Sequence, residues 1–426
     1  MFEKEKKYFP KITDPQCQLK WNWSTLWLNE GTTNSCHRCL RVPLDPNNFD
    51  NFHNLPHKIK EREIMLSGKW PTKENGGSGH CTFCKKVEDR GGVSDRLGML
   101  TIPNQVPNEL LTNNRATSVT PKILEIFLND TCNLKCTYCG TKESSQWESE
   151  IKKYGPLYDD TGNILPDESY KIRNKPKDRQ RLFFEKTLQW IEKNGHKLVK
   201  LILLGGETFY QSELQEILNT LKKVKNPHLE FSIVSNLMVK ENIFKNYIEQ
   251  IKSLCRNRNI GRFDLTASID GWGPEAEYAR SGLKCDHFEK LFAYAVNEKW
   301  MRLNTNSTIT AMTVRSLPLL IEKVKFYRKI NKKILIRFGF VTGKLHLHPN
   351  IYGYDFWKQD IKNILNAMPT DSEVDQLTKE SLKGAFDSIS NVEPDKKIIK
   401  TFKFYLDQLD RRRNTNWRSV YPYLDI

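Results

Sequence analysis

Three cysteines stand close together in the segment TCNLKCTYCG, at Cys132, Cys136 and Cys139. Their C-x3-C-x2-C spacing lets three thiolates hold three irons of one [4Fe-4S] cluster and leaves the fourth iron open. An open iron can bind a small molecule, so such a cluster can do chemistry as well as carry electrons. An incomplete zinc loop, or buried free thiols, would explain the same residues, and both stay as alternatives.

A second group of cysteines lies in the N-terminal part of the chain, at Cys17, Cys36, Cys39, Cys81 and Cys84. The two C-x2-C pairs in this group have the spacing of a four-thiolate zinc knuckle. The chain has ten cysteines and shows no apolar leader at its N-terminus. We therefore expect a cytoplasmic protein whose cysteines serve metal or redox chemistry, because disulfides rarely persist in that compartment.

The elements that must position these thiols follow residue 116, where strand-like and helix-like patterns alternate. Strands are predicted at 122–128, 198–204, 229–235, 262–269, 302–311 and 333–340. Helices are predicted between them at 181–194, 211–224, 240–255, 286–298 and 315–330. This order predicts an α/β fold with a parallel sheet and right-handed crossovers. Since six βα units are too few to close the eight-stranded barrel, we expect a partial (β/α)6 TIM-like barrel.

Polar segments with ligand-binding chemistry come directly after these strands. The cysteine loop follows the first strand, and Gly205-Gly206-Glu207, Ser235-Asn236 and Ser268-Ile269-Asp270-Gly271 follow later ones. Barrels place their active sites at the carboxyl ends of the strands. Glycines there let the backbone approach a ligand, and a carboxylate can bind an ammonium group. A plain turn at the glycines, or a helix N-cap at Ser235-Asn236, is the alternative without a ligand.

The cysteine loop, the GGE segment and the S-x-D-G segment together resemble the radical S-adenosylmethionine (SAM) enzymes, over roughly residues 122–340. The resemblance implies that the open iron binds SAM and that one electron splits SAM into a 5′-deoxyadenosyl radical. It further implies that Tyr138 packs near the adenine, and that Gly205, Gly206 and Glu207 hold the amino group of SAM.

The same resemblance assigns the remaining SAM contacts. Ser235, Asn236 and Ser268 would contact the carboxylate or ribose of SAM, and Asp270 would orient its loop or meet the substrate. Arg280 follows Asp270 by ten residues, where peptide-modifying members place an arginine on the SAM carboxylate. An arginine fork suits a carboxylate, although a solvated loop arginine is the alternative.

The N-terminal thiols also resemble part of this superfamily. Cys17, Gly31 and Cys36 have the spacing C-x13-G-x4-C, which resembles the start of the auxiliary-cluster domains called SPASM and, in shorter form, twitch. The resemblance implies a second [4Fe-4S] cluster on Cys17, Cys36, Cys81 and Cys84, with Cys39 spare. Zinc held by Cys36, Cys39, Cys81 and Cys84 is the alternative. In most members the auxiliary domain follows the barrel, whereas here the thiols precede it.

We expect three parts in the chain. Residues 1–116 would form an irregular, cysteine-rich auxiliary metal region, 117–345 the partial radical SAM barrel, and 346–426 a helical C-terminal extension. Residues 141–180 form a polar insertion beside the cluster loop, which we interpret as a lid or as a disordered spacer.

Composition bounds the function. The net charge of +16 favours nucleic acid, a nucleotide or an acidic peptide as a partner, and a lysine-rich surface explains it equally well. No apolar run approaches the ~20 residues of a membrane span. We expect an enzyme whose radical abstracts hydrogen from a peptide or protein, with an external one-electron donor. Radical modification of nucleic acid or a nucleotide is one alternative, and a non-catalytic zinc-knuckle protein that binds nucleic acid is another.

Overall fold

The computed structural model describes residues 15–36, 38–90, 94, 96–97, 115–165 and 177–426. Residues 1–14 of the predicted auxiliary region and 166–176 of the predicted insertion lie outside this part. Within it, no helix combines the length and the apolar character that a membrane span needs.

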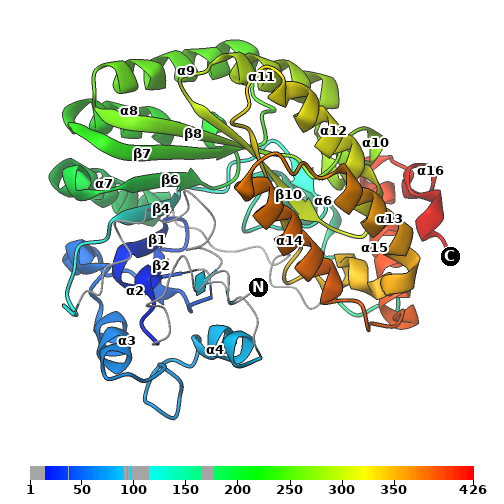
Figure 1. The fold of residues 1–426 in the computed structure, drawn as a ribbon, viewed down its shortest axis with the longest axis horizontal. Helices are drawn as coiled ribbons and strands as arrows, with labels where there is room; N and C mark the ends of the chain where they lie inside the picture. Colours follow the sequence, from blue (N-terminus) through cyan, green and yellow to red (C-terminus); the bar gives the residue numbers. More distant parts are fainter. Residues whose placement is uncertain (1–14, 37, 91–93, 95, 98–114, 166–176) are drawn as a thin grey trace.

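One curved sheet organises the described residues, with the strand order β11-β10-β8-β7-β6-β4-β1-β2-β3 (Figure 1). The predicted strands are β4 (Ile123–Phe127), β6 (Lys200–Leu204), β7 (Asn226–Ser235), β8 (Ile260–Ser268), β10 (Arg302–Ile309) and β11 (Leu335–Phe340). Each of them pairs in parallel with the next. The α/β fold class with a parallel sheet is therefore confirmed.

Helices cover one face of this sheet, as Figure 1 shows. They are α7 (Lys177–Asn194), α8 (Glu213–Lys223), α9 (Glu241–Arg256), α11 (Cys285–Asn297) and α12 (Leu317–Arg328). Because side chains alternate along a strand, fully buried residues such as Leu201 and Phe231 point towards the helices. Their neighbours Lys200 and Ser232 line a cavity on the opposite, inner face.

The N-terminal region extends the same sheet, which differs from the irregular region that we expected. Strand β1 (Trp23–Trp27) pairs in parallel with β4, and β2 (Thr32–Asn34) and β3 (Val42–Pro43) continue it in antiparallel fashion. The helices here are α2 (Gln18–Asn22), α3 (Pro56–Leu66) and α4 (Thr82–Asp89), with the 3-10 helix η1 (Pro46–Asn51). The division at residue 116 stays a prediction.

The C-terminal extension is helical, as expected. Its helices are α13 (Tyr354–Ala367), α14 (Glu373–Asp387), α15 (Lys396–Arg413) and α16 (Trp417–Val420). The insertion contributes α6 (Ser145–Tyr154), whose Trp147 is fully buried. Glu150 of α6 accepts hydrogen bonds from Arg413 of α15. The described part of the insertion is therefore packed against the C-terminal extension.

Candidate active site

The polar segments after β4, β6 and β7 meet at one end of the sheet. The backbone N–H of Gly206 donates to Asn129 O at 2.9 Å, and that of Glu207 donates to Thr131 O at 2.8 Å. A Cβ on Gly206 would lie 2.3 Å from Thr131 O, so only glycine permits this approach. The GGE segment thus packs directly on the cysteine loop.

The three cysteines lie on this loop at different depths. Cys136 is in the short strand β5 (Lys135–Cys136), which pairs antiparallel with β9 (Arg280–Ser281), opposite Arg280. The hydrogen bond with Cys139 lowers the pKa of the Cys136 thiol to about 7, and the charge of Arg280 acts in the same direction. Burial raises the pKa of the Cys132 thiol to about 12.

A buried ionic cluster joins Tyr138, Asp270 and Arg280. The Tyr138 hydroxyl donates to Asp270 Oδ2 at 2.5 Å, and Arg280 Nη1 lies 3.1 Å from the same oxygen. The backbone N–H of Thr308 donates to Asp270 Oδ1 at 2.8 Å. Asp270 is fully buried and Arg280 is 7% exposed, so Arg280 is not a solvated loop arginine. Its Nε is buried without a hydrogen-bond partner in the described residues.

Hydrogen bonds to Glu207 connect the end of β7 with the candidate active site. Its carboxylate accepts hydrogen bonds from Phe209 N at 3.1 Å, Ser235 Oγ at 2.8 Å and Asn236 N at 2.6 Å. Burial raises the pKa of Glu207, while the hydrogen bond from Asn236 opposes that shift. Leu237, the residue after Asn236, has a backbone φ of 54°. This is a strained conformation of the kind found at functional sites.

Asn236 and Ser268 complete the predicted SAM contacts. Asn236 Nδ2 donates to Asn133 Oδ1 at 3.0 Å and lies 3.8 Å from Cys132 Sγ. The N-cap position of α9 is Lys240, so Ser235-Asn236 is not that cap. Ser268 is half-buried at the end of β8, opposite Asn306 of β10.

The backbone of the cysteine loop is held by side chains that the sequence did not point to. Trp147 Nε1 donates to Cys136 O at 2.7 Å, the Tyr405 hydroxyl to Thr137 O at 2.6 Å, and Lys344 Nζ to Cys139 O at 3.0 Å. Lys344 and Tyr405 are 205 and 268 residues away from their partners in the sequence. No local spacing or periodicity can reveal such contacts.

The structure also brings the N-terminal thiols together. The sulfurs of Cys36 and Cys39 are 3.5 Å apart, and the Cys81 thiol lowers the pKa of Cys39. Lys20 Nζ donates to Cys39 Sγ at 3.0 Å. The hydrogen bond from Cys36 holds the pKa of Cys39 well below its usual value, and Lys20 adds to that effect. Cys39 therefore lies among the thiols, although the resemblance left it spare.

Cys17 and Cys84 lie at the buried side of this group. Burial raises the pKa of the Cys17 thiol, and the nearby thiol of Cys84 raises it further. Arg96 donates to Gln16 O at 2.9 Å and binds the Glu88 carboxylate through Nε and Nη2. In the described part of the chain, no three His, Cys, Asp or Glu side chains converge as a site for a single metal ion.

A cavity of about 320 Å³ occupies the inner face of the sheet, between the barrel strands and the N-terminal region. Its walls combine aromatic side chains, charged groups and one thiol: Trp23, Trp27, Phe127, Glu125, Lys200, Arg337 and Cys36. Asn306 faces this cavity too. The cavity lies inside the curve of the partial barrel, within the size range of a ligand pocket.

The model of the radical SAM superfamily matches residues 126–275, and no curated protein matches the chain. The chain is similar to Streptococcus suis SuiB bound to precursor peptide SuiA, with 14% identity over 82% of this chain and 69% of that one, and a TM-score of 0.38. It is also similar to native anSMEcpe with bound AdoMet and Kp18Cys peptide, with 18% identity, coverages of 58% and 59%, and a TM-score of 0.35.

The matched residues 126–275 contain the cysteine loop, the GGE segment, Ser235-Asn236 and Asp270. These are the segments that the fold assembles at one end of the sheet. Residues 126–275 therefore match a radical SAM superfamily domain, and this match indicates an enzyme.

Proposed function

We propose that Cys132, Cys136 and Cys139 bind a [4Fe-4S] cluster and that the segments around them bind SAM. The observation that carries this proposal is the meeting of the three-thiol loop with the GGE, Ser235-Asn236 and Asp270 segments within the matched domain. When bound, the cluster and SAM supply a one-electron cleavage that yields a 5′-deoxyadenosyl radical.

The residues present fit a cluster held by three thiolates. The N–H of Leu134 lies 3.4 Å from Cys132 Sγ, and the Asn236 amide lies 3.8 Å from it. The positive charge of Arg280 acts on Cys132 and Cys136. Donors and a cation beside the sulfurs oppose the effect of burial on the pKa of Cys132 and favour the thiolate form, which is the form that binds iron.

The residues around the loop also fit SAM. The buried Nε of Arg280 has a free N–H in the described residues, and a guanidinium N–H suits the SAM carboxylate. An ionised carboxylate offers about four acceptor positions. Glu207 is fully buried and uses three of them internally, so one position has no donor among the described residues, and the amino group of SAM would take it.

We further propose a peptide or protein as the substrate. The S-x-D-G segment with Arg280 resembles peptide-modifying members of the superfamily. The cavity of about 320 Å³ on the inner face mixes aromatic, polar and charged walls, which suits an amino-acid side chain. An external one-electron donor would reduce the cluster.

The N-terminal thiols are proposed to bind a second [4Fe-4S] cluster, within a twitch-like auxiliary region. The contacts among Cys36, Cys39 and Cys81, and the Lys20 ammonium beside them, support a metal site in which the thiols are deprotonated. Four of the five thiols would be the ligands, and metal analysis decides whether zinc replaces the cluster.

Anaerobic reconstitution with iron and sulfide, followed by metal counting and assay of 5′-deoxyadenosine under dithionite, tests the proposal. We expect about eight irons per chain for two clusters. A triple Cys132/Cys136/Cys139→Ala variant should keep about four irons and form no 5′-deoxyadenosine. The matched control is the double Cys255→Ala, Cys285→Ala variant, which changes thiols outside both groups and should behave as the unmodified chain.

Two outcomes would overturn the proposal. The first is 5′-deoxyadenosine formation that survives in the triple variant. The second is zinc as the only metal, together with salt-dependent binding of RNA or DNA, which would favour the non-catalytic zinc-knuckle alternative.

A further inference from the structure

The inner face of the sheet carries a network of charged side chains below the candidate active site. Lys200 Nζ lies 2.6 Å from Glu230 Oε1, and Arg262 pairs with both Glu230 and Asp264. These residues are neighbours in register across β6, β7 and β8. Lys200 and Arg262 therefore have carboxylate partners within the sheet.

Two arginines of the same face have no such partner. In the described residues, Arg302 Nη1 of β10 and Arg337 Nε of β11 are buried without a hydrogen-bond partner. Burial lowers the pKa of Arg337, Asp264 raises it and Arg302 lowers it. Arg302 lies opposite Asp264 in the register of β8 and β10, and Arg337 lies opposite Asn306 in the register of β10 and β11.

The charges of this face do not balance within the described residues. Lys200, Arg262, Arg302 and Arg337 carry four positive charges, and Glu125, Glu230 and Asp264 carry three negative ones. Glu125 lies on β4, where Thr25 Oγ1 of β1 donates to it at 2.7 Å. Of the two arginines without a carboxylate partner in the described residues, Arg337 lines the cavity of about 320 Å³.

We propose that Arg337, assisted by Arg302, binds a carboxylate of the substrate inside this cavity, so that the enzyme takes a peptide with an acidic side chain. The assignment of an acidic peptide rests on the proposed function, in which the substrate is a peptide. The presence of an anion-binding site does not depend on that function. An arginine fork matches a carboxylate in shape and charge. The aromatic wall of Trp23, Trp27 and Phe127 would contact the aliphatic part of such a side chain. The net charge of +16 also favours an acidic partner.

The test compares two small probes, N-acetylglutamate N-methylamide and its neutral isostere N-acetylglutamine N-methylamide. Each is titrated into the reconstituted full chain with SAM and without reductant, and binding is followed by saturation-transfer NMR. We expect the glutamate probe to bind about tenfold more tightly than the glutamine probe. Arg337→Met should remove this difference, Arg337→Lys should keep part of it, and Arg302→Met should reduce it.

Three controls make the result specific. Arg256→Met, on the exposed end of α9, should leave both affinities unchanged. N-acetylglycine, which carries only a terminal carboxylate, should bind more weakly than the glutamate probe; tighter binding would show that the site takes a peptide C-terminus and would overturn the side-chain assignment. Circular dichroism and SAM affinity of Arg337→Met should equal those of the unmodified chain.

Equal affinity for the two probes, or an unchanged preference in both Arg337 variants, would overturn the anion site. Loss of SAM binding in Arg337→Met would overturn it too, because the carboxylate would then be that of SAM. The same titration on the triple cysteine variant separates this inference from the proposed function. One outcome is that the triple cysteine variant keeps the preference for glutamate while the unmodified chain forms no 5′-deoxyadenosine. That result would support the anion site and contradict the proposed radical chemistry.

Discussion

Asp270 is the buried anion on which the other polar side chains of the site depend. It accepts hydrogen bonds from Tyr138, Arg280 and the backbone of Thr308. Asp270→Asn keeps the size of the side chain but leaves the Arg280 guanidinium buried without a counter-ion. We expect the free energy of unfolding to fall by about 3 kcal/mol, measured from urea titrations under anaerobic conditions.

Tyr138→Phe is the matched comparison for Asp270→Asn, because it removes one hydroxyl from the same cluster without changing its charge. Its expected cost is about 1 kcal/mol, the usual value of one hydrogen bond. If Asp270→Asn costs no more than Tyr138→Phe, then Asp270 is not the counter-ion of Arg280.

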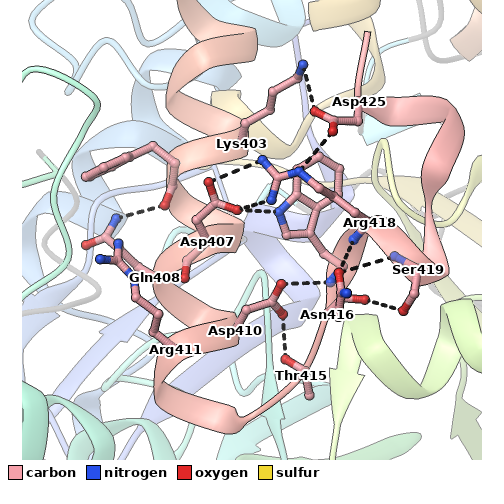
Figure 2. A network of polar contacts seen from close by, with 12 residues as sticks. Lys403, Asp407, Gln408, Asp410, Arg411, Thr415, Asn416, Arg418, Ser419 and Asp425 are labelled. Carbon is pink, nitrogen blue, oxygen red and sulfur yellow. Dashed lines mark hydrogen bonds and ion pairs between the residues drawn. The ribbon is translucent and has the colours of Figure 1, made fainter.

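Among the elements, helix α15 supports the cysteine loop, because it places the Tyr405 hydroxyl where it donates to Thr137 O. The C-terminal segment fixes this helix, as Figure 2 shows. Asp407 accepts from Arg418 at 2.5 Å, and Asp410 accepts from Thr415 at 2.6 Å. Lys403 and Asp425 form an ion pair of 3.0 Å. The end of the chain therefore holds α15 against the loop that carries the cluster ligands.

Tyr405→Phe tests this support. It leaves the buried Thr137 carbonyl without its donor, which costs about 1–3 kcal/mol and should loosen the cysteine loop. We expect faster hydrogen exchange in the peptide 132–140 and faster loss of iron to a chelator. Tyr423→Phe is the control, since the Tyr423 hydroxyl is buried without a hydrogen-bond partner in the described residues. Equal exchange and iron loss in the two variants would contradict the role of Tyr405.

Periodicity explains which elements the sequence predicted and which it did not. The six barrel strands alternate or are continuously apolar over five or more residues, so their positions were predicted within a few residues. Strands β2 and β3 have only three and two residues, too few for a pattern. The GGE and S-x-D-G segments were found because they follow strands directly. The contact between Tyr405 and Thr137 depends on tertiary packing and leaves no trace in local sequence.

At the scale of the whole molecule, the N-terminal region and the barrel share both a sheet and a small apolar core. Trp21, Trp23 and Met65 pack with Ile123 of β4 and Ile202 of β6 in that core. The fully buried Arg62 donates to Lys20 O at 2.8 Å and Thr117 O at 2.7 Å. Arg62 thus links helix α3 to the segment that leads into β4.

Removing residues 1–116 should therefore not leave a folded barrel. The truncation exposes the edge of β4, and an open strand edge with an apolar surface promotes aggregation. We expect residues 117–426 to elute as aggregates in gel filtration and to unfold without a cooperative transition. The comparison is Arg62→Met in the full chain, which leaves the carbonyls of Lys20 and Thr117 without this donor. It should lower the free energy of unfolding by about 3 kcal/mol but stay monodisperse on the same column. If the truncated chain instead unfolds cooperatively and retains about four irons, the N-terminal region is an independent domain. The boundary predicted at residue 116 would then mark a separation in folding as well as in sequence.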